Sequence, residues 1–223
     1  MSDKQQEQTV RIYLYTRFER FWHWLQAFMI IFLIVTGMEI HGTFTLLGYK
    51  RAFYLHSYTG LAWVMLFVFF VFWLFTTGEW RQYVPTTKKL FAVIIYYSIG
   101  IFQGKPHPVQ KSPGAKHNPL QRLSYLALST LLLPIQMITG LLYYTWNFWG
   151  SGRVEFLSDI SLMPVAALHT LISFMILSFL LIHVYMTTTG HTLFSHISGM
   201  VTGWEEVHHT TQIQDWERPK IHK

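Results

Sequence analysis

The sequence contains no cysteine, and few of its residues are charged. The absence of cysteine excludes disulfide bonds, thiolate zinc sites, iron–sulfur clusters and covalently attached c-type haem in this chain. Charged residues make up 13% and hydrophobic residues 51% of the 223 residues. A soluble domain carries roughly 25% charged residues. We therefore predict an integral membrane protein that forms a single domain over residues 1–223.

Other features are also missing. We find no nucleotide-binding motif, internal repeat or soluble domain, so we do not expect the chain to oxidise a substrate unaided. The polar N-terminal segment lacks a cleavable signal pattern, and we expect the first apolar span to be retained as an anchor. The net charge of +6 calls for no nucleic-acid partner, because basic residues that gather on one side of a membrane explain it.

Four apolar stretches are long enough, at about 20 residues, to cross a bilayer. They cover residues 18–38, 55–77, 120–146 and 163–188. The apolar segment 90–102 is too short to cross, so a short interfacial helix is expected between spans 2 and 3. Residues 103–117 are expected to form a loop, residues 191–201 a short amphipathic helix, and residues 202–223 a polar tail. The predicted fold is an all-α bundle of four transmembrane helices.

The distribution of Lys and Arg predicts the orientation of the chain in the membrane. Fourteen of them fall in the N-terminal tail, the loop between spans 2 and 3, and the C-terminal tail. Only Lys50, Arg51 and Arg153 fall on the other side. Cytoplasmic loops are enriched in positive charge. Both termini are therefore predicted to be cytoplasmic, in a bacterial inner membrane.

Two histidines of span 4, His169 and His183, are fourteen residues apart. That separation rises about 21 Å and completes almost four turns, so both imidazoles leave nearly the same helix face. The orientation places His23 and His183 near the inner edge of the membrane, and His56 and His169 near the outer edge. Ionisable groups inside a membrane span commonly mark function. Two pairs at two depths predict bis-histidine ligation of two b haems in a helical bundle.

Alternatives remain for these histidines. His23 or His56 alone could lie at the headgroup level as an interfacial residue. A zinc site would have too few ligands, because each level offers two histidines and no obvious intramembrane carboxylate. Gly37, Gly60 and Gly140 could let a flat macrocycle approach the helix backbones, although ordinary helix packing explains them equally well.

Polar residues at the inner side are candidates for further contacts. Arg20, three residues before His23, could pair with a propionate of the inner haem, or anchor the helix end in the headgroups. Asn118 precedes Pro119 and suits an N-cap at the start of span 3. Its side chain could instead donate a hydrogen bond to a quinone carbonyl. His107 and His117 are weak candidates for a proton path.

Several segments carry a family resemblance that covers roughly residues 10–205. The matching residues are Arg20-Phe21-Trp22-His23-Trp24, Leu55-His56-Ser57-Tyr58-Thr59-Gly60, Lys116-His117-Asn118-Pro119-Leu120-Gln121, and His169 with His183. With them the chain resembles the cytochrome b subunits of respiratory formate dehydrogenases, membrane-bound nickel–iron hydrogenases and thiosulfate reductases.

This resemblance implies the same pairing of ligands: His23 with His183, and His56 with His169. It also implies a menaquinone or ubiquinone beside Asn118, and we include Gln121 of the same motif in that candidate site. A glycine of the family's quinone site is replaced here by Leu120. The implied partners are an iron–sulfur subunit, on the outer face, and a catalytic subunit.

The sequence as a whole predicts a diheme b-type cytochrome subunit. It would move electrons across the membrane between a quinone pool and a partner oxidoreductase complex. The alternative is a haem-containing membrane anchor without a quinone site of its own. A histidine-based transporter is a third class, although the discontinuous helices and repeats common in transporters are missing from the pattern.

Overall fold

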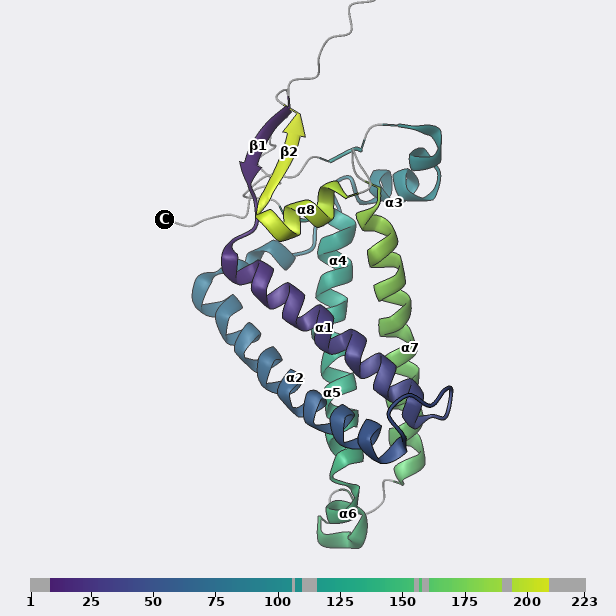
Figure 1. Cartoon of the computed structure of the whole chain (residues 1–223). Helices are drawn as coiled ribbons and strands as arrows, with labels where there is room; N and C mark the ends of the chain where they lie inside the picture. The colour runs from purple at the N-terminus through teal and green to yellow at the C-terminus, as the bar shows by residue number, and fades with distance from the viewer. Residues whose placement is uncertain are drawn as a thin grey trace, which may run out of the picture. The chain divides into compact units, whose positions relative to one another are not determined.

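The computed structural model describes residues 9–105, 107–109, 116–154, 157, 161–189 and 194–208. Within them, four helices are long and apolar enough to cross a membrane, which confirms the four predicted spans (Figure 1). They are α1 (Arg17–Ile40), α2 (Tyr49–Thr77), the helix Pro119–Tyr144 and α7 (Leu162–Thr187). Helices suit such apolar sequences because they satisfy every backbone polar group internally.

The third span changes its winding near the middle. It consists of α4 (Pro119–Ala127), a π-helical turn η3 (Leu128–Leu132) and α5 (Leu133–Tyr144). Pro134 follows the wider turn and has no N–H to donate to the preceding turn.

Short helices lie between these spans and after the last of them. They are η1 (Glu79–Tyr83), α3 (Leu90–Ser98), η2 (Gly100–Gln103), α6 (Trp146–Phe148), η4 (Trp149–Arg153) and α8 (Ser195–Thr202). The expected helix at 90–102 is thus present as α3 followed by η2, while its place at the membrane surface stays a prediction. The helix expected over 191–201 begins at Ser195. Residues 191–193 of that expected helix and residues 209–223 of the expected tail lie outside the described part of the chain.

The expectation of a purely helical chain is wrong at the two ends. Strand β1 (Thr9–Tyr13) pairs antiparallel with β2 (Trp204–His208), and Thr9 lies opposite His208 (Figure 1). The ring of Tyr13 meets that of Trp204 edge to face, with centroids 5.3 Å apart. Cross-strand aromatic pairs of this kind stabilise a short ribbon. The pairing joins residues almost two hundred positions apart, so no local pattern announces it.

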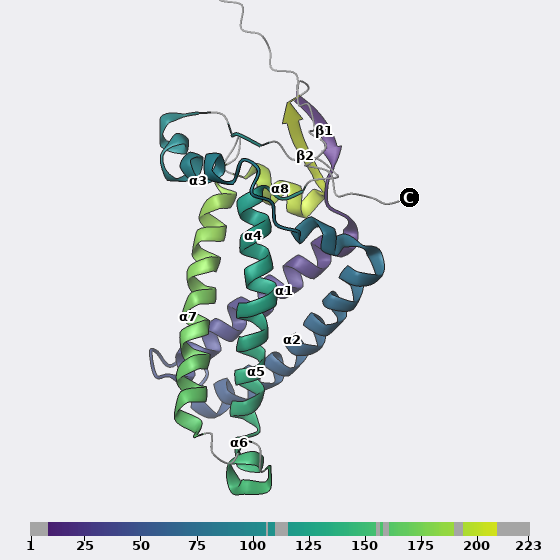
Figure 2. The same ribbon diagram turned by 180° about the vertical axis from the view of Figure 1, so that it is seen from behind.

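The chain divides into two compact units, and we describe each by itself. The first comprises residues 1–21, 74–126 and 183–223, and the second comprises residues 22–73 and 127–182. In the second unit α5 runs beside α7 (Figure 2). Its buried core consists of Met29, Trp63, Leu133, Met137, Ile172 and Ile176. The single-domain organisation remains a prediction.

A buried carboxylate holds the connection between α1 and α2. Glu39 lies in the last turn of α1 and is only 4% exposed. Its Oε1 accepts hydrogen bonds from the backbone N–H groups of Leu46 at 2.9 Å, Leu47 at 2.6 Å and Gly48 at 2.7 Å. The sequence reasoning overlooked this carboxylate. It fixes the turn directly before α2, and α2 carries His56.

Candidate functional site

Two of the four predicted histidines face each other within the second unit. His56 comes from α2 and His169 from α7, and their ring centroids are 6.3 Å apart with planes inclined at 74°. Two imidazoles on opposite sides of one metal ion need their ring centres about 6 Å apart, since each metal–nitrogen bond is about 2 Å. The spacing therefore fits two axial ligands of one haem.

A threonine fixes the proton position on each ring. Thr36 Oγ1 lies 3.0 Å from His56 Nδ1, and Thr139 Oγ1 lies 3.1 Å from His169 Nδ1. The two hydroxyls donate to carbonyl oxygens of their own helices, at 2.8 Å and 2.7 Å. Each Oγ1 therefore accepts from the histidine, so that Nδ1 carries the proton. The lone pair of Nε2 is left for a metal ion.

An amide of α5 confirms this proton position for one ring. Gln136 is 9% exposed, and its Nε2 lies 3.1 Å from Nε2 of His169. An amide nitrogen can only donate, so Nε2 of His169 is an acceptor. Oε1 of Gln136 is buried without a hydrogen-bond partner among the described residues. Buried polar atoms usually have a hydrogen-bond partner, so this oxygen marks a position beside His169 where a bound group could donate a hydrogen bond.

Two glycines let the helices approach these rings. A Cβ added at Gly37 would lie 3.3 Å from Cε1 of His56, and one added at Gly140 would lie 3.1 Å from Cε1 of His169. Both distances are tighter than most real Cβ contacts. Gly60, the third glycine singled out from the sequence, meets Leu33 instead. Gly37 and Gly140 thus serve close contact with the histidine rings.

The donor set favours haem over a metal ion held by protein groups alone. In the described part of the chain there is no group of three or more His, Cys, Asp or Glu side chains that could hold a metal ion. Two histidines with unprotonated Nε2 atoms leave structural zinc short of ligands. They suffice for haem, because the macrocycle itself supplies the other iron ligands.

The other two predicted ligands belong to different units. His23, in the second unit, has the ring of Trp24 edge-on at 5.2 Å. His183, in the first unit, has the ring of Tyr125 at 6.3 Å, and Tyr125 meets His117 at 5.0 Å. Both histidines are half-buried. Their pairing stays a prediction.

Arg20 has a structural contact in the first unit. Its Nη1 donates a hydrogen bond to the carbonyl oxygen of Val201 in α8. This bond ties the start of α1 to α8. Its Nε is buried without a hydrogen-bond partner among the described residues. Nη1 of Arg20 is therefore already used in a hydrogen bond, and the predicted contact with a haem propionate would have to use the remaining N–H donors.

The two residues of the predicted quinone site form a capping box at the start of α4. Oδ1 of Asn118 accepts from the N–H of Gln121 at 2.9 Å, and Oε1 of Gln121 accepts from the N–H of Asn118 at 3.0 Å. Such reciprocal bonds satisfy backbone donors at a helix start. The amide nitrogen of Asn118 donates to the hydroxyl of Tyr97 at 3.2 Å. The capping interpretation of Asn118 thus matches the geometry.

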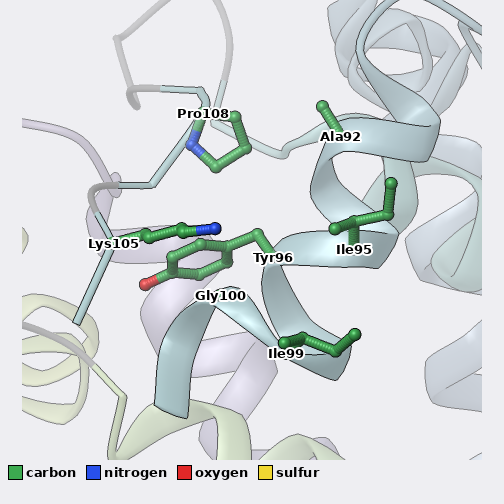
Figure 3. A pocket seen from close by; sticks show the side chains of 7 residues that line it. All are labelled: Ala92, Ile95, Tyr96, Ile99, Gly100, Lys105 and Pro108. Carbon is green, nitrogen blue, oxygen red and sulfur yellow. The ribbon is translucent and has the colours of Figure 1, made fainter. Parts of the chain in front are cut away.

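A hydrogen-bonded chain leads from Asn118 towards the loop after η2. The Tyr97 hydroxyl lies 3.1 Å from Nε2 of His107. Tyr96 meets His107 edge to face at 4.8 Å and also lines a pocket of about 200 Å³. Figure 3 shows Tyr96 and Lys105 together in this pocket. Its other walls are Ala92 and Ile95 of α3, followed by Ile99, Gly100 and Pro108. The pocket therefore adjoins, through Tyr96, the chain that ends at Asn118.

The first unit contains an ion-pair cluster, Lys116 with Glu19 and Glu79, that was not predicted from the sequence. Lys116 is 6% exposed, and its Nζ lies 2.5 Å from Glu19 Oε1 and 3.4 Å from Glu79 Oε2. Glu19 also closes a capping box with Thr16 at the start of α1. Lys116 therefore connects the beginning of α1 with η1 and with the segment that leads into α4. Sequence spacing gives no signal for such a contact.

Two tyrosines near this cluster keep their hydroxyl protons. Burial raises the pKa of Tyr15 above its ordinary value, and the carboxylates of Glu205 and Glu19 raise it further. Burial likewise raises the pKa of Tyr83, and Tyr125 and the carboxylates of Glu19 and Glu79 raise it further. Both remain neutral hydroxyls at physiological pH.

The family of the chain follows from its match to known proteins. The model of the prokaryotic cytochrome b561 family matches residues 14–203, so the chain belongs to that family. Membership makes it an integral membrane b-type cytochrome, which holds haem b and takes part in electron transfer. The resemblance to hydrogenase-type cytochrome b subunits is confirmed, while the likeness to the subunits of formate dehydrogenases and thiosulfate reductases stays a prediction.

Individual relatives share about a quarter of their residues with this chain. The putative cytochrome YdhU of Escherichia coli (strain K12) is 27% identical over 206 residues, which cover 87% of this chain and 74% of that protein. A probable Ni/Fe-hydrogenase B-type cytochrome subunit of Rhizobium leguminosarum bv. viciae is 27% identical, covering 86% of this chain and 87% of its own. A protein of the same description from Rhodobacter capsulatus is 25% identical, covering 86% and 80%.

Proposed function

We propose that this chain is a diheme b-type cytochrome subunit that moves electrons across the membrane between a quinone pool and a partner oxidoreductase. The observation that carries the proposal is the pair His56 and His169, whose rings face each other at 6.3 Å and whose Nε2 atoms are the unprotonated ring nitrogens. Nε2 of His169 accepts from the amide of Gln136, which would have to give way to a haem iron. When bound, haem b supplies an iron that accepts and releases one electron at a time.

The outer site would be held by His56 and His169. Thr36 and Thr139 orient the two rings, while Gly37 and Gly140 leave room beside them. His23 and His183 would hold a second haem at the inner edge of the membrane. This second pairing is supported by the fourteen-residue interval on α7, which rises about 21 Å and returns His183 to nearly the same helix face as its outer counterpart.

Replacing single histidines tests the pairing. We expect His56→Ala to lose one haem and keep the other, and His23→Ala to lose the other one. Redox titration identifies which haem remains, because two haems at different depths and exposures have different potentials. Loss of the same haem in both variants would contradict the pairing. Far-UV circular dichroism of each variant checks that the helices are intact.

A quinone site beside Asn118 would make the subunit the point of exchange with the pool. We propose that the amide nitrogen of Asn118 serves such a site, with Gln121 holding the asparagine in place. The chain Asn118–Tyr97–His107 supports this function, since it offers hydrogen-bonding groups between the amide and the cytoplasmic loop. Leu120 stands where the resembling subunits have a glycine, so the quinone pose would differ from theirs.

The alternative is a haem-containing anchor without its own quinone site. One observation favours it: the capping box already uses Oδ1 of Asn118 and Oε1 of Gln121. Asn118→Asp separates the two functions, because Asp caps a helix as well as Asn but has no amide donor. We expect quinol-dependent haem reduction to slow in Asn118→Asp with both haems retained. An unchanged rate would favour the anchor.

The partners are proposed from the relatives. Two of them are described as probable Ni/Fe-hydrogenase B-type cytochrome subunits. We propose a similar complex, in which an iron–sulfur subunit docks on the outer face and a catalytic subunit supplies electrons. The bilayer would be the bacterial cytoplasmic membrane, with both termini on the cytoplasmic side as the basic residues predict. Affinity purification from native membranes, followed by mass spectrometry, identifies the partner.

A further inference from the structure

We propose that two Thr-Gly pairs, Thr36-Gly37 on α1 and Thr139-Gly140 on α5, are equivalent positioning elements that set the reduction potential of the outer haem. The inference rests on the proposed haem between His56 and His169. The threonines act through the histidines and would not touch the iron.

The geometry of the two pairs is the same. In each, a threonine hydroxyl donates to the carbonyl oxygen four residues earlier, at Phe32 or Ile135, and accepts from Nδ1 of a histidine on the neighbouring helix. The following glycine lies against Cε1 of that same histidine. Each pair thus contacts two adjacent atoms of one imidazole.

The two residue types depend on each other. A threonine hydroxyl reaches a ring on another helix only when the backbones come close together. Glycine permits this approach, because a Cβ at position 37 or 140 would press on the ring at 3.3 Å or 3.1 Å. The glycine sets the distance between helix and ring, and the threonine sets the rotation and the protonated nitrogen of the ring.

The hydrogen bond has an electronic consequence. An Nδ1–H that donates to an oxygen makes the imidazole a stronger electron donor at Nε2. A stronger donor stabilises the oxidised iron and lowers the reduction potential. Because both axial ligands carry the same bond, we expect the two threonines to lower the potential of one haem additively, with no effect on the other haem.

Ordinary helix packing gives a different expectation. Threonine hydroxyls in membrane helices often bond to a carbonyl of the preceding turn without any further role. Thr145 does this with the carbonyl of Leu141 at 2.7 Å. Replacement by valine keeps the shape of threonine and removes the hydroxyl, so a role in packing alone predicts no shift in the potential of one particular haem at Thr36 or Thr139. Thr145 is exposed, and it controls for loss of the bond to the preceding turn.

The test compares valine and serine variants. Thr36→Val, Thr139→Val and the double variant are purified with haem, alongside Thr145→Val as the matched control. Redox titration and low-temperature electron paramagnetic resonance report each haem separately. We expect each valine variant to raise the potential of one haem, the same haem in both, and the double variant to raise it further. Thr36→Ser, Thr139→Ser and Thr145→Val should leave it unchanged.

Each outcome decides the proposal. Unchanged potential and resonance in both valine variants, with two haems retained, would overturn the threonine role while leaving the proposed function intact. Loss of one haem in the valine variants that serine prevents supports the role of the hydroxyl. The same loss in the serine variants contradicts it. If His56→Ala retains every haem of the wild-type chain, the proposed function itself fails.

Discussion

Removing the buried cation Lys116 should destabilise the protein strongly. Its Nζ is paired with Glu19 at 2.5 Å and Glu79 at 3.4 Å, and the exposed fractions of the three side chains are 7%, 16% and 31%. Lys116→Met keeps the apolar stem and leaves two carboxylates facing each other without a cation. Breaking a fully buried pair costs about 3–5 kcal/mol.

The partial exposure of Glu19 and Glu79 reduces the expected loss of stability. Glu79 is partly solvated and its distance is long, so its share is that of a surface pair, about 0.2–1 kcal/mol. Most of the effect must come from Glu19, which is the shorter and more buried contact. We therefore expect Lys116→Met to lower the free energy of unfolding by about 3 kcal/mol. The melting temperature should fall by roughly 6–12 °C.

Thermal unfolding in nanodiscs, followed by circular dichroism, measures this effect. Adding Glu19→Gln to Lys116→Met should restore about half or more of the loss, because the glutamine oxygen can still cap Thr16 without an uncompensated charge. Glu79→Gln alone should change stability by less than about 1 kcal/mol. A Lys116→Met variant as stable as the wild type, or a double variant less stable than the single one, would refute the reasoning.

Substitutions at the two glycines and at Glu39 give two further predictions. Gly140→Ala should disturb the haem held by His56 and His169 more than Gly37→Ala does, because its Cβ would lie 3.1 Å rather than 3.3 Å from the histidine ring. The Soret and α-band absorption spectra measure this disturbance. Unchanged spectra in both variants would show that the rings can move away from the added methyl group. Glu39→Ala should lower the melting temperature because three backbone N–H groups lose a charged acceptor, and Glu39→Gln should lower it less. An unchanged melting temperature in Glu39→Ala would mean that the turn before α2 does not depend on the carboxylate.

Much of the fold was predictable because it depends on local composition. The four spans are long apolar runs, and the cap at Asn118 has its sequence signature in Asn-Pro and in Gln121 three residues later. The start of α2 was predicted too late, at residue 55. The structure begins it at Tyr49, because Lys50 and Arg51 suggest a loop by their charge yet sit on the exposed first turn of the helix.

The candidate site was predictable only in part. Helix periodicity and the expected orientation predicted that His56 and His169 form a pair, and the structure places their rings 6.3 Å apart. Periodicity and orientation could not show which helix packs against each ring, so the roles of Thr36 and Thr139 stayed hidden. The dipeptide Thr-Gly at 36–37 and 139–140 is no distinctive signal, because it occurs four more times in the chain, for example at Thr59-Gly60.

Contacts between distant segments carried no signal at all. The ribbon of β1 and β2 and the pair Lys116–Glu19 depend on how remote parts of the first unit come together. Short strands and single ion pairs have no periodicity to detect. Their positions follow from the packing of the helices that they connect.

The most direct test of a diheme cytochrome is the number and type of haems on the purified chain. Pyridine haemochrome absorbance, measured against protein concentration from amino-acid analysis, gives both. We expect two b-type haems per chain, one held by His56 and His169 and one by His23 and His183. A folded chain with a single haem would show that one of these pairs is wrong, and a folded chain without haem would contradict the proposed function altogether.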